Sequence, residues 1–453
     1  MSAASQHRSL LGSGRRLFGT DGVRGVANLE LTPDLALSLG RAAGLQLSVG
    51  PALVGRDTRR SGEMLSLALQ SGFHSAGIDT VDVGIMPAGG ISYLTASTGA
   101  TMGAVVSASH NPASDNGIKF LSATGTKLTD DEEDQIEVRL RSESARIPTG
   151  HLVGTRFHDS KALNSYVSFL AKVARYSYRG LNLAVDAANG AAFQAAPAVL
   201  SKLGAQVERY AVEPDGTNIN LDCGSTYPEF LASKAEGRIG LAFDGDADRL
   251  LAIDEDGNPV NGDAIMAIVA LHWKAQGRLK NNRVVATVMS NLGFRRAMEG
   301  AGIELIETKV GDRYVLEAMN EHRAILGGEQ SGHIIFLDKG RTGDGLMTAI
   351  RLLDIVAGSG QELRQLRKEA MVEYPQVLKN VKVARGVDLS AAKEVWDAVA
   401  EVEKELGSEG RVLIRPSGTE PVVRVMVEAA SQEQAGGYAD RLAEVVARQL
   451  AER

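Results

Sequence analysis

Short apolar runs alternate with amphipathic stretches along much of the chain. An apolar run of this kind predicts a buried strand, and apolar residues that recur every third or fourth position predict a helix. A unit of strand, helix, glycine and second strand occurs three times, at residues 52–83, 181–212 and 283–308. The pattern therefore predicts an α/β protein with three similar α/β domains.

The three copies barely match in residue identity, so the repeat rests on spacing and pattern alone. Three unrelated β-α-β units in one large sheet would give the same pattern, and this alternative stays open. A length of 453 residues exceeds what one hydrophobic core usually holds, which favours several domains.

From residue 378 onward the pattern changes. Strands are expected at 378–383, 411–414 and 422–427, and helices at 389–406 and at the end of the chain. Strands and helices without parallel crossovers predict a smaller C-terminal α+β domain. The expected domains cover residues 1–155, 156–260, 261–372 and 373–453.

Composition and charge narrow the class of protein. Hydrophobic residues make up 44% of the chain and charged residues 23%, as in soluble globular proteins. The net charge is −7 and no basic patch stands out, which argues against a nucleic-acid partner. The single cysteine, Cys223, excludes an intrachain disulfide, and no apolar run approaches the roughly 20 residues that cross a bilayer. We therefore expect a cytoplasmic protein without a membrane partner.

A serine loop follows the apolar run at residues 104–106. Its sequence is Ser-Ala-Ser-His-Asn-Pro, residues 107–112, and the Asn-Pro pair predicts a turn. A serine at a strand end can carry a phosphoryl group covalently if its surroundings neutralise the charge. Ser109 is the candidate, although the local spacing does not separate it from Ser107, and a solvated polar loop is the simpler alternative.

Three alternating aspartates form the strongest motif. Asp244, Asp246 and Asp248 directly follow the apolar strand predicted at residues 239–243. In an extended backbone they would share one face, and in a loop they can converge. Three hard oxygen ligands without histidine or cysteine suit Mg²⁺. A solvated acidic turn is the alternative.

Two glycine-containing loops add candidate binding groups. The first lies between two apolar strands and offers groups that can bind the hydroxyls of a sugar, from Glu329, Ser331 and His333. The second offers a guanidinium, hydroxyls and backbone N–H groups that suit a phosphate, from Arg415, Ser417, Gly418 and Thr419. A structural turn is the alternative for the first loop, and a tight hairpin for the second.

Three further residues are candidates for direct roles in chemistry. Arg24, His110 and Lys119 could shield a phosphoryl group or move protons. Isolated charged residues more often belong to the solvated surface, so the sequence supports these three assignments less strongly than it supports the motifs.

The four motifs occur in the order and spacing of the α-D-phosphohexomutase superfamily, which the chain resembles from about Leu17 onward. They are residues 107–112, 244–249, 328–333 and 415–421. Residues 19–25, 215–226 and 329–333 also resemble superfamily members that act on glucosamine phosphate. Tyr227 stands where those members have histidine, and Ala113 and Ser114 replace bulkier residues.

The resemblance implies three related α/β domains and a smaller fourth domain around a central cleft. It implies a phosphorylated Ser109, with Mg²⁺ held by a phosphoserine oxygen and by Asp244, Asp246 and Asp248. The loop at 329–333 would contact the sugar, and the loop at 415–419 would hold the phosphate that is not being transferred. The resemblance also allows a homodimer.

The implied reaction interconverts glucosamine 6-phosphate and glucosamine 1-phosphate. Glucosamine 1,6-bisphosphate would be the intermediate and activator, and the product would supply UDP-N-acetylglucosamine for the cell wall. Phosphoryl transfer depends on in-line positioning and on neutralisation of charge, which fits the four motifs.

Three rival functions remain at this point. A mutase for glucose or mannose phosphates would differ from this one only in the sugar on which it acts. The sequence shows no residue that can be recognised as contacting the group at C2 of the sugar. A phosphatase would hydrolyse the phosphoserine. A catalytically silent sugar-phosphate sensor should lack the serine or one aspartate, whereas all of these residues are present.

Overall fold

The computed structural model describes residues 16–19, 21–47, 49–142, 148–384, 387–416 and 421–450. The chain forms two compact units. The first contains residues 1–289 and 304–368, and the second contains residues 290–303 and 369–453.

The first unit begins with a six-stranded sheet of order β1-β5-β4-β2-β3-β6. Strands β4, β2, β3 and β6 run parallel, and β5 is antiparallel to both β4 and β1. The carboxyl ends of the parallel strands meet at one edge, where the loops that follow them come together. The strands are β1 (Val23–Val26), β2 (Ala52–Arg56), β3 (Thr80–Ile85), β4 (Met102–Val106), β5 (Asp115–Ser122) and β6 (Arg156–His158).

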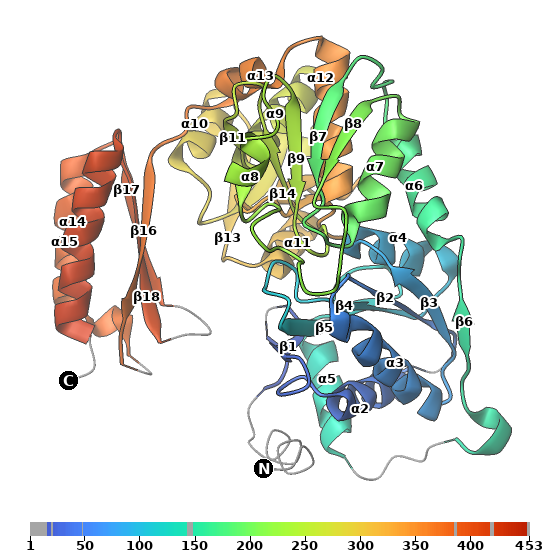
Figure 1. The fold of residues 1–453 in the computed structure, drawn as a ribbon. Coiled ribbons are helices and arrows are strands. Elements are labelled where there is room, and N and C mark those ends of the chain that lie inside the picture. The colour runs from blue at the N-terminus through green and yellow to red at the C-terminus, as the bar shows by residue number, and fades with distance from the viewer. Residues whose placement is uncertain are drawn as a thin grey trace. The chain divides into compact units, whose positions relative to one another are not determined.

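Helices cover both faces of this sheet. They are α2 (Pro33–Gly44), α3 (Arg60–Ser75), α4 (Ala88–Thr98) and α5 (Asp130–Arg141). Figure 1 shows α2, α3 and α5 on one face and α4 on the other. Fully buried apolar side chains, among them Leu39, Leu69 and Ile136, join α2, α3 and α5 to the sheet in one core.

The second sheet has five strands in the order β11-β10-β9-β7-β8, and β9, β7 and β8 run parallel. Its strands are β7 (Asn182–Asp186), β8 (Gln206–Tyr210), β9 (Ile239–Phe243), β10 (Leu250–Ile253) and β11 (Pro259–Val260). The helices in this part of the chain are α6 (Ala162–Val173), α7 (Ala192–Lys202) and α8 (Pro228–Ala232).

The third sheet has four strands in the order β13-β12-β14-β15, and only β15 is antiparallel to its neighbour. Its strands are β12 (Arg283–Thr287), β13 (Glu304–Thr308), β14 (Leu326–Gly328) and β15 (Ile334–Phe336). The helices around it in the sequence are α9 (Gly262–Ala275), α11 (Asp312–Glu321), α12 (Gly345–Ser359) and α13 (Leu363–Ala370).

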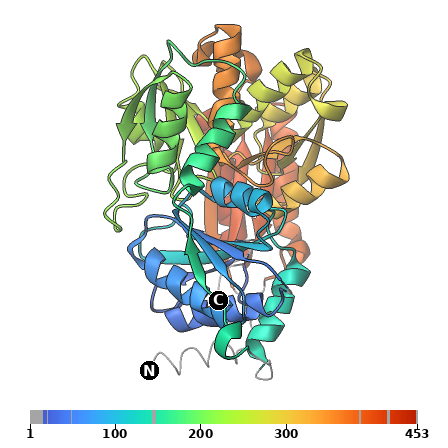
Figure 2. The ribbon, with the colours of Figure 1, turned by 90° about the vertical axis from the view of Figure 1, so that its right-hand side faces the viewer.

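Helix α6 joins these layers. It runs beside α4, as Figures 1 and 2 both show, and the rings of Tyr93 and Phe169 stack there with centroids 3.9 Å apart. The hydroxyl of Tyr166 donates a hydrogen bond of 2.8 Å to Asp344, the residue that caps α12. Side chains of α6 therefore connect α4 of the first sheet with the start of α12.

The second unit contains an antiparallel sheet of order β16-β18-β17. Apolar side chains of α14 and α15, such as Val402 and Leu442, are fully buried in its core. Its elements are α10 (Leu292–Gly300), β16 (Gln376–Lys382), α14 (Lys393–Leu406), β17 (Arg411–Pro416), β18 (Val422–Glu428) and α15 (Gln432–Leu450). The prediction of a C-terminal α+β domain is confirmed.

The three predicted α/β units are also confirmed, as each of the three larger sheets contains a parallel β-α-β crossover. Thr32 caps α2, since its hydroxyl accepts a hydrogen bond from the Leu35 N–H. The helix ends at Gly44, and the chain turns at Leu45. Helix α4 was not predicted.

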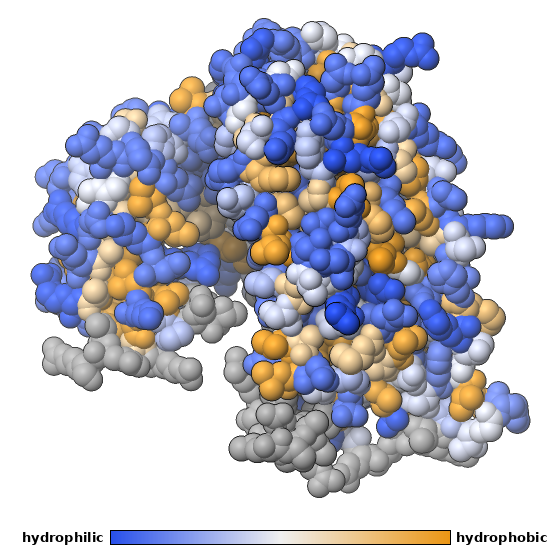
Figure 3. Space-filling model, viewed as in Figure 1, coloured by the Kyte–Doolittle hydropathy of each residue, from blue (hydrophilic) through white to orange (hydrophobic). Residues whose placement is uncertain are grey.

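The surface of the molecule is largely polar in the view of Figure 3, with apolar residues in small separate groups. No helix within the described ranges has the length and apolar character that a bilayer crossing needs.

Candidate active site

Ser109 lies on the loop between β4 and β5, within reach of the loop that follows β9. Its hydroxyl donates a hydrogen bond of 2.5 Å to the Asp244 carboxylate. Its backbone is left-handed, with φ of +52°, which is uncommon for a residue with a side chain. Such strain persists only where the surrounding structure holds it, and it clusters at functional sites.

Ser107 occupies a different environment from Ser109. Its hydroxyl donates to Asp57 at 2.6 Å and accepts from the Ser109 N–H at 2.9 Å. The side chain is fully buried. Ser107 therefore supports the loop, while the Ser109 hydroxyl faces the aspartates.

A buried arginine holds the serine loop in place. Arg59 is 1% exposed and follows β2. Its guanidinium donates to the carbonyl oxygens of Ser109 at 2.9 Å and Asn111 at 2.8 Å, and its Nε donates to Asp57 at 2.8 Å. Asp57 thus joins Arg59 to Ser107, and the unusual backbone of the loop is fixed by charge-assisted hydrogen bonds.

The three predicted aspartates converge in a loop. Asp244, Asp246 and Asp248 are buried, and ligand oxygens from all three lie within 4.8 Å of one another. The turn between them depends on Ala247, whose φ is +57°. Gly245 lets this loop approach the serine loop, because a Cβ there would overlap the carbonyl oxygen of Ser109.

The donor set fits a hard divalent cation. One oxygen each of Asp246 and Asp248 is buried and has no hydrogen-bond partner among the described residues. Buried carboxylate oxygens without partners are costly unless a cation binds them. All-oxygen ligation of this kind suits Mg²⁺.

The pKa values of two of these carboxyls move apart. Burial, followed by the charges of Asp248 and Asp246, raises the pKa of Asp244 well above its ordinary value. Burial opposes ionisation of Asp248 as well, but His333 and Lys119 hold the pKa of that carboxyl well below its ordinary value. Repulsion among the closely spaced carboxylates is thus the main unfavourable electrostatic interaction in the site.

Lys119 is the positively charged side chain nearest these carboxylates. It lies on β5, and its Nζ is 3.1 Å from Asp246, 3.8 Å from Asp248 and 3.0 Å from Asp21. Lys127 extends the network, with its Nζ 2.6 Å from Asp21 and in contact with Asp312. Charged side chains from the parts of the chain around the first and third sheets therefore meet near the aspartate loop.

The other two candidates near the serine also lie here. His110 Nδ1 is 3.3 Å from the Ser109 hydroxyl. Burial, with the charges of Arg249 and Arg24, lowers the pKa of His110 to about 4, so its imidazole is neutral at pH 7. Arg24 pairs with Asp21 and donates to the Asn111 side chain at 3.2 Å.

The loop between β14 and β15 reaches the same region. His333 is buried, and its Nδ1 is 3.4 Å from Asp248. The Glu329 carboxylate accepts from the Gly311 N–H at 3.1 Å, and Ser331 is exposed. Gly332 has φ of +93°, and a Cβ there would overlap the carbonyl oxygen of Leu250, so only glycine fits this turn.

The predicted phosphate loop is only partly described. Arg415 is half-buried on β17, where it pairs in register with Arg424 of β18. Ser417, Gly418 and Thr419 lie outside the described residues.

Several residues of the site were not among the predicted ones. Arg59 and Asp57 position the serine loop, and Asp21, Lys127 and Asp312 complete the charge network. The sequence contains a pattern that could have indicated Arg59 and Asp57. It is the charged run Arg-Asp-Thr-Arg at residues 56–59, at the end of an apolar run that predicts a buried strand. Lys127 and Asp312 are far apart in sequence, and neither stands in a motif that announces the pairing.

Family models match nearly the whole chain. The phosphoglucomutase/phosphomannomutase alpha/beta/alpha domains I, II and III match residues 15–146, 164–257 and 261–374, and the C-terminal domain of that family matches residues 378–445. The chain belongs to the phosphoglucomutase/phosphomannomutase family, within the α-D-phosphohexomutase superfamily.

Two relatives of the chain have names that specify the sugar more closely than the family name does. A phosphoglucosamine mutase of Carboxydothermus hydrogenoformans is 51% identical over 440 residues, which cover 95% of this chain and 99% of the relative. A phosphoglucosamine mutase of Desulforamulus reducens is 49% identical with the same coverage. The crystal structure of a phosphoglucomutase/phosphomannomutase family protein from Burkholderia thailandensis superposes with a TM-score of 0.79 at 27% identity, covering 96% of this chain and 97% of that one.

Proposed function

We propose that the chain is an intramolecular phosphotransferase that interconverts glucosamine 6-phosphate and glucosamine 1-phosphate. Identity of about 50% to phosphoglucosamine mutases over nearly the full chain supports the sugar. The observation that carries the chemistry is the 2.5 Å hydrogen bond between the Ser109 hydroxyl and Asp244, within a cluster of three aspartates.

Ser109 is the proposed phosphoryl carrier. A phosphorylated Ser109 would transfer its phosphoryl group to a hydroxyl of the sugar phosphate, giving glucosamine 1,6-bisphosphate. The P–O bond to Ser109 breaks, a P–O bond to the sugar forms, and the sugar hydroxyl releases a proton. The reverse transfer takes the other phosphate back to Ser109 and leaves the isomer.

The residues around Ser109 have complementary proposed roles. His110, neutral at pH 7 and 3.3 Å from the hydroxyl, can accept or return a proton. Arg24 and Lys119 supply positive charge near the transferring group. Their positions support these roles because phosphoryl transfer is driven mainly by positioning and by neutralisation of charge.

The proposed cation ligands are Asp244, Asp246 and Asp248, with an oxygen of the phosphorylated Ser109. A bound Mg²⁺ would neutralise charge that develops on the transferring phosphoryl group. The unpartnered oxygens of Asp246 and Asp248 support this assignment.

The proposed substrate contacts lie on two loops. Glu329, Ser331 and His333 would bind the sugar, and His333 would also orient Asp248. The phosphate that is not being transferred would be held by Arg415, Ser417, Gly418 and Thr419. Four domains with boundaries near residues 155, 260 and 372 are proposed to carry these loops.

The test is a comparison of kcat/KM for glucosamine, glucose and mannose 6-phosphates with the phosphorylated enzyme. We expect glucosamine 6-phosphate to be preferred. Equal or higher values for glucose or mannose phosphate would favour the alternative mutase. Release of inorganic phosphate without a sugar 1-phosphate would indicate a phosphatase.

A further inference from the structure

The side-chain amide of Asn220 contacts the serine loop from another part of the chain. Asn220 lies between β8 and α8, and its Nδ2 donates to the carbonyl oxygens of Ser109 at 2.9 Å and Asn111 at 3.1 Å. The same two oxygens accept from the guanidinium of Arg59. Since a carbonyl oxygen has two lone pairs, each of them can accept from both donors at once.

This amide lies where the serine loop approaches the aspartate loop, residues 244–248. Gly245 separates the first two aspartates of that loop, and a Cβ there would lie 2.9 Å from Asn220 Nδ2. The same Cβ would overlap the Ser109 carbonyl oxygen. Asn220 Oδ1 is buried and has no partner among the described residues, so the amide acts on its surroundings as a donor.

The backbone of Asn220 is fixed to the end of β7. Its N–H donates to the Ala188 carbonyl at 2.9 Å. The buried Asp186 carboxylate accepts from the N–H groups of Ala188 at 2.8 Å and Gly224 at 2.6 Å. Asn220 has φ of +58°, a left-handed conformation that asparagine tolerates better than most residues do. The amide is therefore held toward the serine loop by a well-bonded support.

Two further hydrogen bonds join this support to the chain after β2. The Arg60 N–H, at the start of α3, donates to the Gly216 carbonyl at 2.9 Å. The Thr58 hydroxyl donates to the Asn189 carbonyl at 2.5 Å. The turn after β2, the serine loop and the segment that ends at Asn220 thus form one hydrogen-bonded contact between the parts of the chain around the first and second sheets.

The proposed reaction needs Ser109 and the aspartates in fixed relative positions. They come from different sheets, and misplacement of a reacting group by about 1 Å can cost about 100-fold in rate. Arg59 fixes the serine loop within its own sheet, because its printed partners all lie between residues 57 and 115. Asn220 adds a side-chain contact from the part of the chain that carries the aspartates.

We propose that Asn220 is a positioning residue for Ser109, and that its amide holds the serine loop against the part of the chain that carries the aspartates. Its effect passes through two backbone carbonyl groups of the loop. The expected effect on turnover rests on the proposed function, whereas the link between the two segments is a property of the fold.

Hydrogen exchange measures this link without reference to activity. The N–H groups of Ser109 and Asn111 donate to Ser107 Oγ at 2.9 Å and to the Ala108 carbonyl at 3.1 Å, so they exchange only when the loop opens. Asn220→Gly keeps the left-handed backbone and removes the amide. We expect the peptide that contains the serine loop to exchange about tenfold faster in this variant, because two hydrogen bonds to the loop are lost.

Turnover tests whether the link matters for the reaction. Asn220→Gly should lower kcat about tenfold and leave KM for glucosamine 6-phosphate little changed, because the proposed substrate contacts lie on other loops. Asn220→Asp should lower kcat further, since a carboxylate would face the two carbonyl oxygens that accept from the amide. A purely structural defect would instead lower the unfolding temperature and leave kcat of the folded enzyme unchanged.

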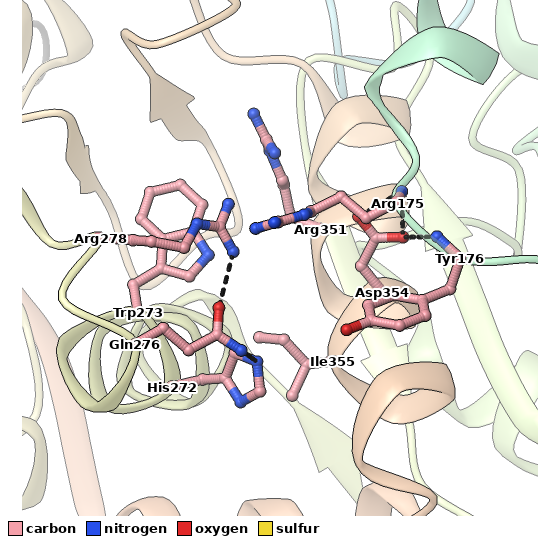
Figure 4. Close-up of a pocket in the computed structure, with 9 residues that line it drawn as sticks. All are labelled: Arg175, Tyr176, His272, Trp273, Gln276, Arg278, Arg351, Asp354 and Ile355. Carbon is pink, nitrogen blue, oxygen red and sulfur yellow. Dashed lines mark hydrogen bonds between the residues drawn. The ribbon is translucent and has the colours of Figure 1, made fainter.

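Two control variants separate these effects. Asn282→Gly makes the same change at an exposed asparagine with φ of +49°, just before β12. Asp354→Asn weakens a link of the same kind elsewhere. The Asp354 carboxylate joins α12 to the connection after α6, because it accepts from the N–H groups of Arg175 at 2.9 Å and Tyr176 at 3.4 Å (Figure 4). Neither variant should change the exchange of the serine loop or kcat.

The proposal is overturned if the serine loop of Asn220→Gly exchanges as slowly as that of the unmodified chain. Faster exchange with unchanged kcat, or equal effects of Asn282→Gly, would overturn it as well. An unmodified chain without mutase turnover would contradict the proposed function, and the exchange of Asn220→Gly would still decide whether Asn220 holds the loop.

Discussion

At the scale of single residues, the two serines of one loop have different hydrogen-bond partners. Ser107 is engaged as both donor and acceptor, whereas Ser109 directs its hydroxyl at Asp244. The sequence predicted a phosphoryl carrier in this loop but could not choose between them by spacing. The proposal of Ser109 is supported by Asp57, which lies on a different loop and accepts a hydrogen bond from the Ser107 hydroxyl.

The only cysteine should be inert in the folded protein. Cys223 is 3% exposed, and burial, with the charges of Asp186 and Asp222, raises the pKa of its thiol to about 12. At pH 8 only about one molecule in 10,000 would carry the reactive thiolate, whereas an ordinary thiol has a pKa near 8.5. We expect a thiol-specific disulfide reagent to react very slowly with the native chain and at once after denaturation. Rapid stoichiometric reaction of the native chain would contradict this environment.

At the scale of elements, the loop between β4 and β5 depends on an arginine contributed from the end of β2. Arg59 donates to two carbonyl oxygens of that loop and to Asp57. Its side chain is fully buried, so it positions Ser109 through the backbone of the loop. Its role follows from one guanidinium having enough donors in a fixed plane to hold several acceptors.

Arg59→Lys should damage catalysis while leaving the charge in place. Lysine cannot reproduce the planar set of donors, so the serine loop should shift. A shift of about 1 Å can cost about 100-fold in rate, and we expect a loss of that order in kcat with KM for the sugar phosphate little changed. Arg60→Lys, at the neighbouring exposed position, is the control. Equal activity of the two variants would show that Arg59 does not position the loop.

A comparison of the predicted with the observed strands and helices shows which of them the sequence pattern can predict. The strand before the aspartates is found at Ile239–Phe243, as predicted, because its run of apolar residues is buried on both faces. Helix α4 was missed because its sequence, Ala-Gly-Gly-Ile-Ser-Tyr-Leu-Thr-Ala-Ser-Thr, has small and polar residues on every side and no clear apolar stripe. The ion pair between Lys127 and Asp312 could not be predicted, because it joins segments that only the fold brings together.

At the scale of the whole molecule, bound Mg²⁺ should be linked to the stability of the first unit. The three aspartates come from that unit, and their mutual repulsion in the absence of a cation costs stability. A ligand that binds only the folded state raises the unfolding temperature as its concentration rises above its dissociation constant.

We therefore expect Mg²⁺ to raise the unfolding temperature of the chain after treatment with EDTA, and calorimetry with increasing MgCl₂ measures this. Asp246→Asn removes one charged ligand, so the rise should need a much higher Mg²⁺ concentration. Asp256→Asn, a change at an exposed carboxylate on the turn between β10 and β11, should respond as the unmodified chain does. The metal assignment fails if Asp246→Asn keeps the full response at the same Mg²⁺ concentrations.

The most direct measurement of the central claim is the position of the phosphoryl group on the protein. The chain is incubated with glucosamine 1,6-bisphosphate labelled with ³²P, and the labelled peptide is sequenced by fragmentation mass spectrometry. We predict that the label lies on Ser109, that Ser107→Ala still acquires it, and that Ser109→Ala acquires none and has no mutase turnover. A label on Ser107, or appreciable turnover by Ser109→Ala, would contradict the account.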